Sequence, residues 1–194
     1  MTHVTLRPVS GNIRDVAGEL DAADERALSI VRGLTDAQGC WRPRERLPSV
    51  GECMARHLGW LARTVPILDD GVRAVRSGWR ARLGKSRSAW WWQSVPRLLE
   101  LVPVLPIGEG EVREICGRRP VRAIMADILR YHAEVRRLAR VGELKDLGTA
   151  QVRLPSLCAL QCPLDVALAM VPAMARRHLR LAERVRLAAG FPRQ

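Results

Sequence analysis

Long apolar runs are missing from this chain of 194 residues. None approaches the roughly 18 to 20 uninterrupted apolar residues that a membrane-spanning helix needs. The first residues, MTHVTLRPVSGN, also lack the charged and then apolar layout of a signal peptide. The sequence therefore predicts no membrane insertion and a cytoplasmic location. A convincing period-two strand pattern is missing as well, which favours an all-α fold.

Cysteines are few, and their spacing suggests no framework. The chain has five, at positions Cys40, Cys53, Cys116, Cys158 and Cys162. An odd number without a pair of CxxC motifs argues against a disulfide-stapled fold and against a zinc ribbon. Buried free thiols are the simplest interpretation.

Lysine is nearly absent, so arginine supplies the positive charge. Lysine occurs only at Lys85 and Lys145, although 32 basic residues face 20 acidic ones and the formal net charge is +12. Such an excess of arginine is compatible with binding nucleic-acid phosphates. However, the arginines are spread along predicted helices among Asp and Glu, and no nucleic-acid-binding motif accompanies them. This distribution favours solvated helix faces and argues against a nucleic-acid partner.

Helical periodicity dominates what remains. Hydrophobic residues make up 47% of the chain and charged residues 27%, the balance of a soluble globular protein, and one domain over residues 1–194 is expected. Apolar residues at three- and four-residue steps predict four long helices. These lie at about Ile13 to Leu34, from Ser49 onward with Pro66 expected to kink the helix or end its first part, from Pro120 to Gly142, and from a cap at Asp165 to about Ala189.

A long connection separates the second and third helices. Periodicity is lost from Ser77 to Gly117, where glycine, proline and the triplet Trp90, Trp91 and Trp92 leave room for one short helix. Three adjacent rings cannot share one face, so the triplet is a candidate lid, ligand-contacting wall or dimer surface, or simply covers the open end of a bundle. The predicted fold is an all-α four-helix bundle with this long connection.

Two stretches resemble the DinB-like superfamily. LTDAQGCWRPRERLPSVGECMARHL carries a Trp-x-Pro loop followed by a Ser-x-x-Glu cap and a helix, and MARRHLRLAERVR is similar to that family's last-helix segment. The resemblance implies a bundle, often a homodimer, that holds a divalent metal with three histidines. Some relatives are transferases or isomerases that depend on bacillithiol or mycothiol, so a low-molecular-weight thiol is a further implied cofactor.

The family's ligand positions carry over to Arg56, Met174 and His178. His57 is one residue out of register, and one residue rotates a side chain by about 100° around a helix, so His57 is not expected to point where the family's ligand points. Arginine is a fixed cation that repels a metal ion. The sequence therefore predicts a degenerate three-histidine site that holds no metal, in which His178 forms a hydrogen bond within the bundle.

Two further interpretations of these positions remain open. Cys53 and His57 are four residues apart, as are Met174 and His178, so the four side chains could form a soft metal site suited to Cu(I) and less well to Zn(II). Alternatively, Arg56 replaces the metal as the anchor for an acidic small molecule or thiol cofactor, and His178 moves a proton. A plain surface ion pair of Arg56 is the competing interpretation.

A non-catalytic role is the alternative to an enzyme. In that case the protein dimerises or docks a partner through Trp90, Trp91 and Trp92, because a monomer rarely leaves several large aromatic rings in contact with water. The sequence alone does not choose between a catalyst and an interaction protein.

Overall fold

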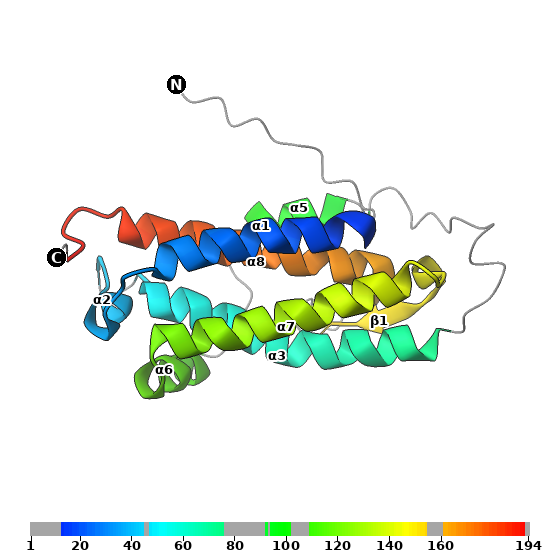
Figure 1. The fold of residues 1–194 in the computed structure, drawn as a ribbon, viewed down its shortest axis with the longest axis horizontal. Coiled ribbons are helices and arrows are strands. Elements are labelled where there is room, and N and C mark those ends of the chain that lie inside the picture. Colours follow the sequence, from blue (N-terminus) through cyan, green and yellow to red (C-terminus); the bar gives the residue numbers. More distant parts are fainter. Residues whose placement is uncertain are drawn as a thin grey trace, which may run out of the picture.

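The computed structural model of the chain describes residues 13–44, 47–75, 92, 94–101, 109–154 and 161–192. This part of the chain is mostly helical, which confirms the all-α prediction (Figure 1). Within it, no helix combines the length and the apolar character that crossing a membrane would require. Trp90, Trp91 and Cys158 lie outside the described residues.

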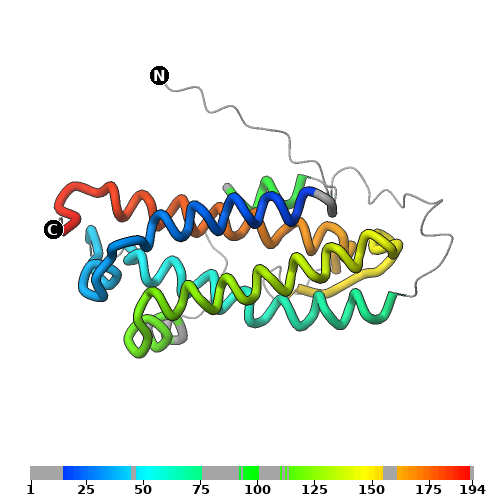
Figure 2. The backbone as a smooth tube through the Cα atoms, viewed as in Figure 1, coloured from blue at the N-terminus to red at the C-terminus, as the bar shows by residue number. Residues whose placement is uncertain are grey.

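Four long helices pack side by side and enclose the apolar core. Helices α1 and α3 each pack against both α7 and α8. Figures 1 and 2 show that α1 and α8 run in one direction and that α3 and α7 run in the other. Buried leucine and isoleucine side chains, such as Leu20, Leu61 and Ile128, fill the space between them. The bounds are α1 Ile13–Val31, α3 Val50–Ala74, α7 Val121–Gly142 and α8 Leu164–Arg186.

The start of α3 follows the predicted capping pattern. The Ser49 hydroxyl accepts a hydrogen bond from the Glu52 amide at 3.1 Å, and the Glu52 carboxylate accepts one from the Ser49 amide at 2.8 Å. Pro66 lies inside the helix, which continues to Ala74, so it does not end the first part of α3. Val65 beside it is buried in the core, and this packing outweighs the one backbone hydrogen bond that proline cannot make.

The last helix begins differently from the prediction. Helix α8 follows Pro163 directly and starts at Leu164, so Asp165 lies inside the first turn and is not the cap. Its carboxylate accepts a hydrogen bond from the adjacent Val166 amide at 2.8 Å. The cap prediction is wrong because a short strand leads straight into the helix. By contrast, α7 ends at Gly142 as predicted.

A two-stranded ribbon was not expected from the sequence. After the 3-10 turn η2 (Leu147–Thr149), strand β1 (Gln151–Arg153) pairs antiparallel with β2 (Gln161–Pro163), and Val152 lies opposite Cys162. Three residues per strand are too few to display an alternating pattern. The ribbon lies at the opposite end of the long helices from α2 (Asp36–Cys40) and α6 (Glu109–Arg118), as Figure 1 shows.

In its described residues, the connection between α3 and α7 contains two short helices, whereas one was expected. Helix α5 (Val95–Leu101) packs against α8, and α6 packs against α3. Trp92, which precedes α5, is half-buried and packs against the core. This placement agrees with a covering role for Trp92, whereas the dimer surface remains a prediction because Trp90 and Trp91 are not described.

Candidate functional site

The four long helices each place one buried polar side chain at the same level of the core. Asp24 lies about two turns before the end of α1, His57 about two turns after the start of α3, His132 about three turns into α7, and His178 about two turns before the end of α8. All four are buried. Because α1 and α8 end on the side where α3 and α7 begin (Figure 1), these positions meet in one layer, which we call the polar layer.

A hydrogen-bonded chain runs through three of these residues. His132 Nδ1 lies 2.5 Å from Asp24 Oδ1, and His132 Nε2 lies 3.0 Å from His57 Nε2. The other Asp24 oxygen accepts a hydrogen bond from Arg136, whose Nε lies 2.8 Å from an Asp21 oxygen. The chain therefore joins α1, α7 and α3 through the interior.

For two neutral rings, the hydrogen bonds define the tautomers of both histidines. A carboxylate only accepts hydrogen bonds, so His132 Nδ1 carries the proton that it shares with Asp24. His132 Nε2 then has a lone pair, which accepts the Nε2 proton of His57. The remaining nitrogen, His57 Nδ1, has a lone pair and is buried without a hydrogen-bond partner in the described part of the chain. A buried polar atom in this state is rare and costly.

His178 lies beside His57 in the polar layer. The two ring centroids are 5.3 Å apart, and His178 Nδ1 donates to the Met174 carbonyl at 2.8 Å. This hydrogen bond within the helical core was predicted. The pKa of His178 is lowered to about 4, chiefly by burial and also by the charges of Arg177 and Arg56, while the hydrogen bond to the Met174 carbonyl acts in the opposite direction. Burial also lowers the pKa of His57 well below its usual range, so both rings are neutral at pH 7.

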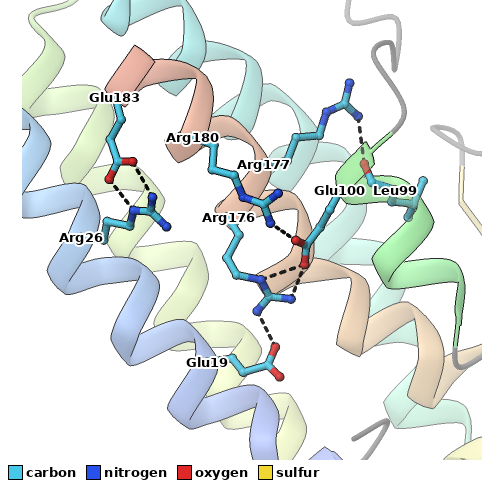
Figure 3. Close-up of polar contacts among 8 residues, drawn as sticks. All are labelled: Glu19, Arg26, Leu99, Glu100, Arg176, Arg177, Arg180 and Glu183. Atoms are coloured by element: carbon cyan, nitrogen blue, oxygen red, sulfur yellow. Dashed lines mark hydrogen bonds and ion pairs between the residues drawn. The ribbon is translucent and has the colours of Figure 1, made fainter. Parts of the chain in front are cut away.

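Arg177 differs from its arginine neighbours on α8. Figure 3 shows Arg176 and Arg180 directed to the Glu100 carboxylate, while Arg177 points to the Leu99 carbonyl of α5. Its one hydrogen bond to a described residue is a long one, 3.4 Å from Nη1 to that carbonyl. Only 8% of Arg177 is exposed, and burial lowers its pKa; no acidic group among the described residues opposes this effect.

Arg56 supplies the second cation near His178. It is half-buried on α3, and no hydrogen bond or ion pair links it to another residue in the ranges that the structure describes. The predicted proximity of Arg56 and His178 agrees with the effect of the Arg56 charge on the His178 pKa. Two Arg-His dipeptides, residues 56–57 and 177–178, thus meet across α3 and α8.

The prediction that His57 does not point where the ligand of the resembled family points stays a prediction. What the structure shows is that His57 faces the core. Its ring lies at the centre of the polar layer, next to the rings of both His178 and His132. Arg56, one residue earlier, stays at the edge of the core. The helix rotates so that the neutral imidazole enters the interior and the guanidinium keeps contact with solvent, which is the arrangement with the smaller desolvation cost.

The metal that the DinB-like resemblance implies does not fit the residues at the positions that the resemblance assigns to its ligands. Arg56 is a cation, and Met174 offers its thioether from a buried position while its carbonyl binds His178. The soft-site alternative needs a thiolate, but burial raises the pKa of the Cys53 thiol to about 12. Across the ranges that the structure describes, no three His, Cys, Asp or Glu side chains are grouped so that they could hold a metal ion.

Three residues of the site were not found by sequence reasoning. Asp24 and His132 occupy the buried stripes of α1 and α7, where one charged residue and one histidine interrupt an otherwise apolar pattern. That interruption was the available signal. Arg177 was visible only as part of the Arg-Arg-His sequence, and its burial depends on the placement of α5.

Comparisons of this chain with protein-family models, with curated proteins and with solved structures find no match.

Proposed function

We propose that this chain is a DinB-like four-helix bundle that binds a small carboxylate-bearing molecule, with Arg56 and Arg177 in place of the family's metal. The anion lies against the two Arg-His dipeptides of α3 and α8. A thiol cofactor with carboxylate groups belongs to the same ligand class. The observation that carries the proposal is Arg177, a buried guanidinium with no acidic partner among the described residues.

The energetics of Arg177 support an anionic ligand. Burying an unpaired charge costs several kcal/mol in a protein interior, and this cost is recovered when a carboxylate forms a two-pronged hydrogen bond with the guanidinium. The adjacent Arg176 already has such partners, because it lies 2.7 Å from Glu19 and 2.6 Å from Glu100. The sequence therefore places two consecutive arginines in opposite situations, one satisfied and one not.

The neutral state of His178 supports the same assignment. Its Nδ1 proton is engaged with Met174, so Nε2 presents a lone pair at pH 7. A neutral imidazole near two guanidinium groups does not add a third positive charge. Instead, it can accept a hydrogen bond or a proton from the bound acid.

The test is a ligand screen on the full chain with sodium acetate, malonate and succinate at constant ionic strength. We expect at least one of these carboxylates to raise the melting temperature and to shift the backbone amide signals of residues 56–57 and 177–178 in NMR spectra. The Arg177→Met variant should lose the response, because the anchor for the anion is gone.

Arg176→Met is the matched control, since it removes an equal charge from the neighbouring position. It should keep the ligand response. Equal loss of response in both variants would indicate general electrostatic attraction and would overturn the assignment to Arg177. The absence of any carboxylate response in the wild-type protein would overturn the proposed function itself.

A further inference from the structure

The polar layer contains a second feature that anion binding does not use. The hydrogen-bonded chain from Asp24 through His132 ends at His57 Nδ1, which has a lone pair and no partner in the described part of the chain. The stacked Trp60 ring lies 6.3 Å from the His57 ring, and Trp60 Nε1 is likewise buried without a partner there. One unsatisfied acceptor and one unsatisfied donor thus occur on two neighbouring, stacked rings.

We propose that Asp24, His132 and His57 form a proton-accepting relay for a hydroxyl group of the bound anion, so that the ligand is a small hydroxy acid. This inference rests on the proposed function, because the carboxylate of the same molecule binds Arg56 and Arg177. A hydroxyl group matches both unsatisfied atoms, since it donates to His57 Nδ1 and accepts from Trp60 Nε1. His57 is the group that touches the ligand, and His132 and Asp24 are positioning residues.

The proton movement balances without a further reactant. The ligand O–H bond breaks, its electron pair stays on oxygen, and the proton goes to His57 Nδ1. The Nε2 proton of His57 can then pass to His132 Nε2, so that the positive charge comes to lie beside the Asp24 carboxylate. The resulting alkoxide remains near the arginine cations. Return of the proton restores the starting state.

Asp24 sets the direction of this relay. Its carboxylate requires the proton on His132 Nδ1. This selects the tautomer of both imidazoles, so that the lone pair of His57 lies on Nδ1. An amide at the same position can donate to His132 Nδ1 and reverse both tautomers. His57 Nδ1 would then carry a proton and could not accept one.

The experiment compares sodium glycolate with sodium acetate, which share a carboxylate and differ in the hydroxyl group. Affinities are measured by NMR titration at fixed ionic strength. We expect wild-type protein to bind glycolate at least about fivefold more tightly than acetate, because the hydroxyl group adds hydrogen bonds to His57 and Trp60. In Asp24→Asn and in His57→Phe the ratio should fall to about one, while acetate binding persists.

A second readout concerns the tautomer itself and needs no ligand. Nitrogen-15 spectra of the histidine rings should show His57 Nδ1 without a proton in the wild-type protein and with a proton in Asp24→Asn. A purely structural role of Asp24 would leave this tautomer unchanged. Measurement of a protonated Nδ1 in the wild-type protein would overturn the relay, even if the His57→Phe variant failed to fold.

The outcomes separate the relay from the anion site. Equal binding of glycolate and acetate to the wild-type protein would overturn the relay and leave the carboxylate site standing. Binding of neither acid would overturn the proposed function, and the hydroxy-acid assignment would fall with it. Tighter glycolate binding that survives Asp24→Asn would place the hydroxyl elsewhere and would also contradict the relay.

Discussion

His57 and His132 are 75 residues apart in the chain, yet their Nε2 atoms lie 3.0 Å apart in the core. This contact joins α3 to α7 through polar atoms where the surrounding packing is apolar. Each Nε2 atom depends on the other for its hydrogen bond, because His57 Nε2 donates the proton that His132 Nε2 accepts. The pair therefore specifies how the two helices are aligned along their length.

The first prediction concerns the loss of this alignment. His132→Leu should lower the free energy of unfolding by about 2 to 4 kcal/mol, since Asp24 and His57 both lose a buried hydrogen-bond partner. Urea denaturation measures the change. Arg122→Gln, at an exposed position on α7, is the control and should change stability by about 0.5 kcal/mol or less. The double variant His57→Leu with His132→Leu should cost less than the sum of the single changes, and simple additivity would contradict the coupling.

The second prediction concerns acid. Burial lowers the folded-state pKa of His178 to about 4, whereas in the unfolded chain it returns to the usual 6.5. Between these pH values the unfolded state binds a proton that the folded state does not, so stability falls as the pH falls from about 7 to about 4. His178 alone contributes about 3 kcal/mol to this loss, and His57 acts in the same direction.

His178→Gln isolates this contribution, because it removes one titrating group. The free energy of unfolding should depend less steeply on pH in the variant, by up to about one proton across this interval. Urea unfolding at a series of pH values gives both slopes. Parallel curves for the two proteins would show that His178 is not held neutral by the fold.

The third prediction uses the two neighbouring arginines of α8. Arg177→Met should raise the free energy of unfolding of the ligand-free protein by about 1 kcal/mol, because a buried and unpaired cation is replaced by an apolar chain of similar length. Arg176→Met should lower it by about 1 kcal/mol, because Glu19 and Glu100 lose a part-buried partner. Thermal or urea unfolding in ligand-free buffer checks both values. Changes of the same sign would mean that the two arginines have equivalent surroundings.

The fourth prediction concerns close packing near the start of α3. A Cβ atom added at Gly51 would lie 2.8 Å from Cys116 Sγ and 3.1 Å from the Gly39 carbonyl oxygen. Gly51→Ala should therefore cost about 1 to 3 kcal/mol. Gly18→Ala is the matched helical control, because no atom lies within 4 Å of the added Cβ atom. It should raise the free energy of unfolding by about 0.5 to 1 kcal/mol. A Gly51→Ala variant with unchanged stability would show that α2 and α6 can move away from α3 at low cost.

Local sequence signals predicted the helices well, and they did so for physical reasons. The capping pair Ser49 and Glu52 needs only four consecutive residues. Gly142 ends α7 as predicted, although its backbone is not left-handed; a Cβ atom there would lie 2.5 Å from Leu147 Cδ1. The β1–β2 ribbon was missed because its stability comes from pairing across a connection and from the core beneath Val152. Such pairing leaves almost no local pattern.

The candidate site could be predicted only in part. His178 and Arg56 were found because they stand in segments that resemble a known family. The partners that change the chemistry, Asp24 and His132, lie on helices with no such resemblance, and their contact is visible only when α1 and α7 are packed together. The contact of His57 with His132 was not predicted, because a register argument concerns one helix and does not say which side chains the other helices bring to it.

The Glu100 carboxylate has a consequence for how this protein must be handled. Its ion pairs with Arg176 and Arg180 link α5 to α8 (Figure 3). The carbonyl that accepts the hydrogen bond from Arg177 belongs to the preceding residue, Leu99. Partly exposed ion pairs weaken as salt is added. Higher ionic strength should therefore loosen the packing of α5 against α8. It should thereby also change how accessible Arg177 is to an anionic ligand. Affinities taken at different salt concentrations would describe differently assembled sites.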